Sequence, residues 1–180
     1  MMFKHTYLYV LFPVLAIFPG TRLMAADPAI NLTGRVIAAA CTVETGLASG
    51  KTVELGTVRR TALQHPGDAG AWNAFTLNLL NCPVGTTKTT VTFTGTPDGD
   101  DSTLFANTEP APGAAQSVAV QMAQDSDRSR IISNSDTLTV NIDAGTHTAS
   151  FPLAARLYAS ADNVQAGRVS STVLVNFSYE

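Results

Sequence analysis

The sequence has few charged residues and no excess of positive charge. Asp, Glu, Lys and Arg together make up 14% of the 180 residues, and 11 basic residues face 14 acidic ones, giving a net charge of −3. Because no basic patch is visible, a nucleic-acid partner or an anionic membrane surface is disfavoured. Hydrophobic residues reach 45%, which is enough for a core and too much for a disordered chain. This length fits a single domain with at most a short appendage.

Long apolar runs are also scarce, and the one that stands out lies at the N-terminus. Lys4 precedes an apolar stretch over residues 7–18, and the small residues Ala25 and Ala26 follow it. This order of features is typical of a secretory signal peptide, which we assign to residues 1–25. The apolar run is shorter than the roughly 20 residues that a membrane-spanning helix needs. Whether cleavage follows Ala25 or Ala26 stays open.

Cysteine is limited to two residues, Cys41 and Cys82. In an exported chain such a pair predicts a disulfide, which would stabilise the fold by about 4 kcal/mol through loop-closure entropy. A zinc site would need more ligands than His65 and His147, the histidines outside the signal segment, can supply. No nucleophile elbow, phosphate-binding loop or zinc-protease helix motif occurs in the sequence. We therefore expect no enzymatic activity and no metal, cofactor or small-molecule substrate.

The sequence does contain a series of short segments in which apolar and polar residues alternate. The clearest covers residues 168–180, where Val173, Val175, Phe177 and Tyr179 fall on one face. A period of two is typical of β-strands that are buried on one side. It recurs, with turn residues in between, over residues 75–79, 89–94, 116–124, 138–142 and 151–157. No window shows a helical period, so we expect an all-β, immunoglobulin-like sandwich of seven or so strands.

One more alternating segment precedes the first cysteine, over residues 26–36. Its apolar face carries Pro28, Ile30, Leu32, Gly34 and Val36. The segment could be an ordinary first strand that pairs within its own domain, or a detachable strand that completes a different molecule. The alternation alone leaves both interpretations open.

Several motifs resemble those of pilin subunits of the chaperone–usher pathway, especially the small tip-adaptor subunits of type 1 fimbriae. The resemblance covers nearly the whole chain after the signal segment and is best over residues 34–43, 71–86, 150–153 and 175–180. Its most specific features are terminal. Members of this family carry a penultimate tyrosine and a glycine that is fourteenth from the end, which here are Tyr179 and Gly167.

The resemblance implies an incomplete immunoglobulin-like β-sandwich, the pilin fold, in residues 37–180, with a donor-strand extension in residues 26–36. The domain would lack its last strand and would accept one from outside. The extension would fill the same gap in another subunit through Pro28, Ile30, Leu32, Gly34 and Val36. The residues implied to line the acceptor groove and to meet the chaperone are Gly167, Val173, Val175, Phe177, Tyr179 and Glu180.

The implied function is that of a structural subunit of a type 1-like adhesive fimbrium, polymerised by donor-strand exchange, with a minor tip-adaptor role and a contribution to cell adhesion. Its partners would be a periplasmic pilus chaperone, an outer-membrane usher and neighbouring pilin subunits. The chain would be exported through the periplasm to an extracellular fimbrium on the bacterial surface. A major rod pilin of the same pathway is the alternative. A secreted, immunoglobulin-like carbohydrate-binding adhesin is disfavoured, because 180 residues leave no room for a lectin domain.

Overall fold

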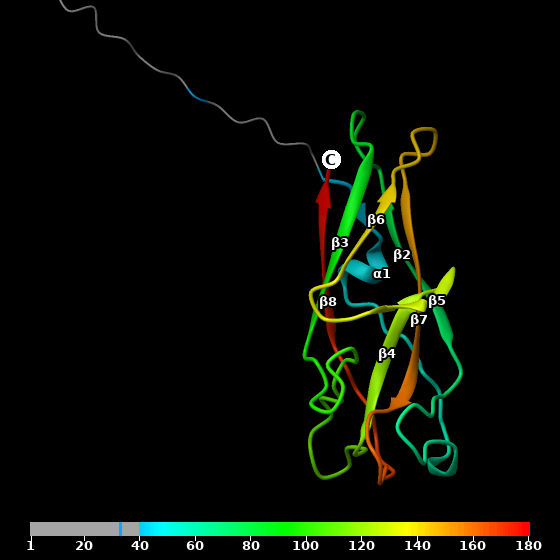
Figure 1. Cartoon of the computed structure of the whole chain (residues 1–180). Helices are drawn as coiled ribbons and strands as arrows, with labels where there is room; N and C mark the ends of the chain where they lie inside the picture. The colour runs from blue at the N-terminus through cyan, green and yellow to red at the C-terminus, as the bar shows by residue number, and fades with distance from the viewer. Residues whose placement is uncertain (1–32, 34–39) are drawn as a thin grey trace, which may run out of the picture. The chain divides into compact units, whose positions relative to one another are not determined.

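The computed structural model describes residues 33 and 40–180, and the described part contains two antiparallel β-sheets (Figure 1). One sheet has the strand order β1-β2-β7-β4-β5, and the other has the order β6-β3-β8. The strands are β1 (Thr42–Val43), β2 (Asn73–Leu80), β3 (Lys88–Gly95), β4 (Val118–Gln124), β5 (Asp127–Ile132), β6 (Thr137–Asn141), β7 (Ala149–Ala159) and β8 (Val173–Tyr179). Helical structure in this part is limited to the single turns α1 (Thr45–Ala48) and η1 (Arg60–Ala62). The expectation of an all-β sandwich is confirmed.

Apolar side chains from both sheets form the main core. Phe93 of β3, Leu79 of β2 and two residues of β7, Phe151 and Leu153, are fully buried, and Phe105 joins them from the connection between β3 and β4. Each large side chain of this kind contributes about 1.5–3 kcal/mol when it leaves water. Four of these five residues occupy alternating positions that the sequence predicts, whereas Phe105 lies outside the predicted segments. Neither of the helical turns in the described residues is long and apolar enough to cross a membrane.

A second, smaller apolar cluster lies toward the C-terminal end of β7. It contains Leu63, Ala115, Val118, Ala159 and Val164. Val169, which precedes β8, packs against this cluster and also against the main core. The chain leading into β8 therefore runs from one apolar cluster to the other.

The predicted disulfide between Cys41 and Cys82 is present, with the two Cα atoms 4.1 Å apart. It joins the chain just before β1 to the chain just after β2, and both half-cystines are buried. His147 lies beside the disulfide and makes two hydrogen-bonding contacts with Cys82. The Cys82 amide donates to the His147 carbonyl at 2.9 Å, and the His147 Nδ1 lies 3.2 Å from the Cys82 carbonyl oxygen.

Strands β1 and β5 lie outside the expected segments, and β8 is shorter than its expected segment. The sequence does not predict β5, because Asp127–Ile132 starts with four polar or charged residues and shows no apolar face. Its pairing with β4 nevertheless forms a hairpin at the edge of the larger sheet. β8 is shorter than the expected 168–180, because β3 ends at Gly95, opposite Val173, and offers no ladder to the residues before it.

Trp72 lies outside the core, although it stands between the cysteines in sequence. The guanidinium of Arg156 lies 4.2 Å from the centre of its ring, and that of Arg128 lies 5.9 Å away. The Nε of Arg156 also donates to Oε1 of Gln121 at 2.8 Å. This stack belongs to the outer face of the larger sheet, because Ala155, the residue before Arg156, pairs with Met122 on the core side.

Candidate strand-binding site

Strand β8 is an edge strand with a single partner among the described residues, β3. At its end, the Glu180 amide donates to the Lys88 carbonyl at 3.0 Å, and the Lys88 amide donates back at 3.2 Å. In an antiparallel pair, residues alternate between those that bond to the partner and those whose N–H and C=O point the other way. The even-numbered residues of β8, like Glu180, therefore bond to β3. The odd-numbered residues direct their main-chain groups away from β3, and these are Val173, Val175, Phe177 and Tyr179.

The same alternation of hydrogen bonding continues in the residues that precede β8, where a loop over residues 107–115 takes the place of β3. The Arg168 amide donates to the Gly113 carbonyl at 2.7 Å, and the Ala115 amide donates to the Arg168 carbonyl at 2.8 Å. The Thr108 amide donates to the Ser170 carbonyl at 2.7 Å. All the bonded residues of the C-terminal segment are even-numbered, so the odd-numbered ones direct their main-chain groups to the other side. We call these six residues the open edge: Val169, Ser171, Val173, Val175, Phe177 and Tyr179.

The side chains of the open edge are half-buried, whereas the intervening side chains are exposed. Five of the six are apolar or aromatic and pack against the main core. Phe177 lies against Phe151, with ring centres 5.7 Å apart and planes tilted by 45°. Leu174, on the opposite face of the same strand, is 67% exposed. The open edge therefore combines main-chain groups without a strand partner in the described residues and an apolar row that is only partly covered.

Residues 51–58 form a second segment whose main-chain groups lack backbone partners among the described residues. They belong to neither sheet, and they make no backbone–backbone hydrogen bond to another described residue. A side-chain amide, Nδ2 of Asn73, donates to the Leu55 carbonyl at 3.3 Å. Leu55 packs against the main core, as Val173 does, and Val58 packs against the smaller cluster, as Val169 does. Each core cluster thus touches both this segment and the open edge.

Apart from Gly167, the residues predicted for strand binding fall into three groups. Val173, Val175, Phe177 and Tyr179 come together on the open edge. Glu180 lies beyond β8, and its carbonyl oxygen accepts from the backbone amides of residues 87 and 88. The donor-strand residues Pro28, Ile30, Leu32, Gly34 and Val36 lie outside the described residues.

Gly167 lies just before the open edge, where two backbones approach closely. A Cβ on this residue would collide with the Ala115 amide nitrogen and would sit 2.7 Å from the Ala114 carbonyl oxygen. A glycine is therefore required for the loop and the C-terminal segment to pair. At the other end of the edge, burial raises the pKa of the Tyr179 phenol, because the ionised form loses contact with water.

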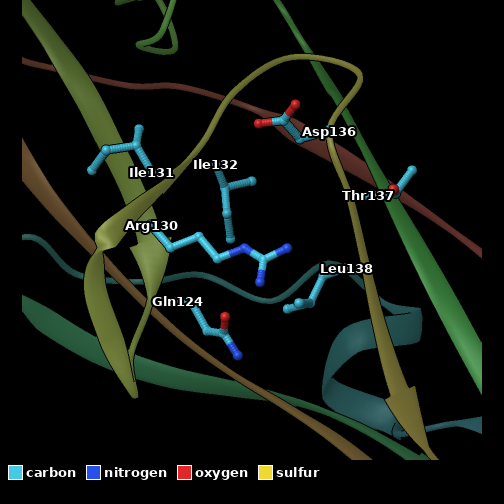
Figure 2. A pocket seen from close by; sticks show the side chains of 7 residues that line it. All are labelled: Gln124, Arg130, Ile131, Ile132, Asp136, Thr137 and Leu138. Carbon is cyan, nitrogen blue, oxygen red and sulfur yellow. The ribbon is translucent and has the colours of Figure 1, made fainter.

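A cavity of about 230 Å³ lies on the opposite side of the sandwich, between β5 and β6 (Figure 2). The buried side chains of Ile132 and Leu138 contribute to its lining, and Arg130 extends across it in Figure 2. Asp136 also contributes, but its Oδ2 accepts the Ser133 amide at 2.8 Å within a turn. Within residues 40–180 and residue 33, no cluster of three or more His, Cys, Asp or Glu residues could hold a metal ion.

Comparisons with known proteins agree with this architecture. The family described as fimbrial protein matches residues 30–180. The chain is 33% identical to Protein FimG of Escherichia coli (strain K12), over 95% of each chain, and 34% identical to the fimbrial-like protein FimF of Salmonella typhimurium, over 83% of each. The solved P pilus rod subunit PapA has a similar fold, with a TM-score of 0.62 at 13% identity over 79% of this chain and 100% of that one.

Proposed function

Because the chain belongs to the fimbrial protein family, we propose that it is a structural subunit of a type 1-like adhesive fimbrium, assembled by exchange of β-strands between subunits. The open edge would accept an extended segment from another subunit. The observation that carries this proposal is the coincidence, over residues 169–179, of main-chain groups turned away from β3 with a half-buried apolar row.

Strand addition accounts for both properties of the open edge. A strand laid beside β8 would pair with its outward N–H and C=O groups, and every second side chain would cover the apolar row. Main-chain pairing supplies affinity, and the alternate side chains supply specificity. An incoming strand that also reached residues 51–58 would satisfy a second set of main-chain groups.

We propose residues 26–36 as the strand that this subunit donates. Ile30 and Leu32 would be its principal apolar residues, with Pro28 and Val36 on either side and Gly34 at a point of close approach. Residues 1–25 would direct export, and residues 37–180 would form the accepting domain. During export a periplasmic chaperone would occupy the open edge near Tyr179 and Glu180, until a neighbouring subunit replaces it at an outer-membrane usher.

We place the chain at the fimbrial tip as a minor adaptor, with the relatives FimG and FimF as the support. A solved structure described as the P pilus adaptor subunit PapF also shares the fold, with a TM-score of 0.54 at 14% identity. The alternative of a major rod pilin is supported by the similar fold of the rod subunit PapA. Both roles use the same open edge and donor strand.

The donor role is tested by a charged substitution on each face of residues 26–36, in cells that assemble fimbriae containing this chain. Leu32→Asp is expected to block incorporation of this subunit into the fibre, because a carboxylate would enter an apolar site in the subunit that receives the strand. The matched control Asn31→Asp alters the other face and is expected to assemble normally. Normal incorporation of the Leu32→Asp chain would contradict the donor role. Loss of the oxidised fold in Leu32→Asp would instead indicate a strand paired within its own domain.

A further inference from the structure

The side chain of Asn107 makes four hydrogen bonds to the backbone, two within the loop over residues 107–115 and two to the C-terminal segment. Its Nδ2 donates to the carbonyl oxygens of Ala115, at 2.9 Å, and Arg168, at 3.0 Å. Its Oδ1 accepts the amides of Ser170, at 3.0 Å, and Glu109, at 3.1 Å. A primary amide has two N–H donors and two acceptor lone pairs, so every hydrogen-bonding position of this side chain is used.

Two further features hold the same junction. Nε of Arg168 donates to Oε1 of Glu109 at 2.6 Å, and Nη2 lies 2.6 Å from the same oxygen. The Glu109 side chain is only 16% exposed. The absence of a side chain at Gly167 lets the two backbones approach, as described above. The loop is thus attached to residues 167–170 by side-chain bonds, by an ion pair and by close backbone contact.

This attachment lies where β3 has ended. Between β3 and the C-terminal segment, the ladder stops at the pair Gly95 and Val173. Arg168 and Ser170 direct their backbone groups toward the loop, so Val169 and Ser171 direct theirs toward the open side of the sheet. Without the loop, these two residues would have no neighbour to fix the direction of their main-chain groups.

We propose that the loop over residues 107–115 is a clamp that extends the strand-accepting edge beyond β8, with Asn107 as its positioning residue. The inference rests on the proposed function, and the occupant is the extended, alternating strand of another subunit. The clamp adds Val169 and Ser171 to the edge. Because Val169 contacts both apolar clusters, an occupant that reaches it covers the smaller cluster as well as the main core.

The test attaches a strand to the chain and measures how much that strand stabilises it. A second copy of residues 26–36 is fused after Glu180 through a glycine–serine linker of about 15 residues, which at roughly 3.3 Å per residue can span the whole edge in either direction. Such a link makes strand binding intramolecular, at an effective concentration in the mM range. Melting temperatures are compared for the fused and unfused chains, each with and without Asn107→Ala.

We expect the fused strand to raise the melting temperature and Asn107→Ala to remove part of that increase. Asn107→Ala should lower the melting temperature of the fused chain by about 2–4 °C more than that of the unfused chain. This is the effect of one lost hydrogen bond in a chain of this size. Asn107→Asp keeps the oxygen that holds the Ser170 amide, but it puts a carboxylate oxygen in place of the donor to the Ala115 and Arg168 carbonyls, so it should not restore the difference. Asn78→Ala is the control, because Asn78 bonds Glu44 and Ser150, away from the edge.

Each outcome has a distinct meaning. An equal drop in the fused and unfused chains would overturn the clamp and leave the strand-accepting function in place. A fused strand that fails to stabilise the unsubstituted chain would overturn the proposed function, and the clamp with it. An excess drop with Asn78→Ala as large as that with Asn107→Ala would show a general loss of stability, and would also overturn the clamp.

Discussion

Phe177 offers the sharpest test of a partly covered apolar row, because its two sides have different neighbours. One side of the ring packs on Phe151 in the core, and the residue remains half-buried because nothing in the described chain covers the rest. Replacing a fully buried phenylalanine by alanine costs about 3–5 kcal/mol. With half of the ring in contact, the unoccupied chain should lose about 2 kcal/mol of unfolding free energy in Phe177→Ala.

An inserted strand would cover the remaining half of the ring and raise the cost of the substitution to the full range. The difference of about 2 kcal/mol would appear as strand binding that is weaker by about 30-fold. Urea unfolding of the unfused chain and of the strand-fused chain measures both costs. The matched control is Leu174→Ala on the exposed face of the same strand, where we expect a loss below about 0.5 kcal/mol in either form. Equal costs of Phe177→Ala in the two forms would show that no strand covers this residue.

Three further predictions concern Gly167, the disulfide and Tyr179. Gly167→Ala should lower the unfolding free energy by about 1–3 kcal/mol, because its Cβ would collide with backbone, whereas Gly99→Ala meets no atom within 4 Å and should be tolerated in thermal unfolding. Reducing the bond between Cys41 and Cys82 should cost about 4 kcal/mol in urea unfolding, and an unchanged midpoint would refute its stabilising role. Burial raises the pKa of Tyr179, so the stability that its neutral form contributes is complete below about pH 10 and is lost as the pH rises through the folded pKa. Unfolding measured across alkaline pH should show this loss, and Tyr179→Phe should remove it.

Strands with a regular apolar face could be predicted from the sequence. The alternating apolar residues before Cys82 fall within β2, and those of residues 151–157 fall within β7, because a half-buried strand must alternate. β5 could not be predicted, since Asp127–Ile132 pairs through its backbone and offers little side-chain pattern. The helical turn α1 has no buried residue, so it too leaves no apolar pattern in the sequence.

The apolar face of the open edge could also be predicted, but its open side could not. Alternation identifies Val173, Val175 and Phe177 as neighbours on one face. It does not reveal that the partner strand lies on one side only, because that depends on pairing between residues that are about 80 positions apart in the chain. The clamp could not be predicted from the sequence for the same reason, since Asn107 and the Ser170 amide that it binds are 63 positions apart. Contacts of this kind follow from the fold and leave no local pattern.

The sheet edges of this domain differ in a way that sets the open edge apart. An exposed edge invites pairing with other chains, and proteins protect such edges with charges, with short strands or by covering them. β5 carries Asp127, Arg128 and Arg130 along its edge, and β1 is only two residues long.

Between Arg168 and Glu180, by contrast, no charged residue and no proline occurs, and the edge-directed residues are mostly apolar. The edges at β5 and β1 thus carry protection that the edge we assign to strand acceptance lacks. Placing a charge there, as in Val175→Lys, is expected to protect this edge as well and to abolish stabilisation by a fused strand. The unfused chain would lose far less, because the lysine could keep its charged end in water. A fused strand that still stabilised the Val175→Lys chain in full would show that the edge accepts its partner elsewhere.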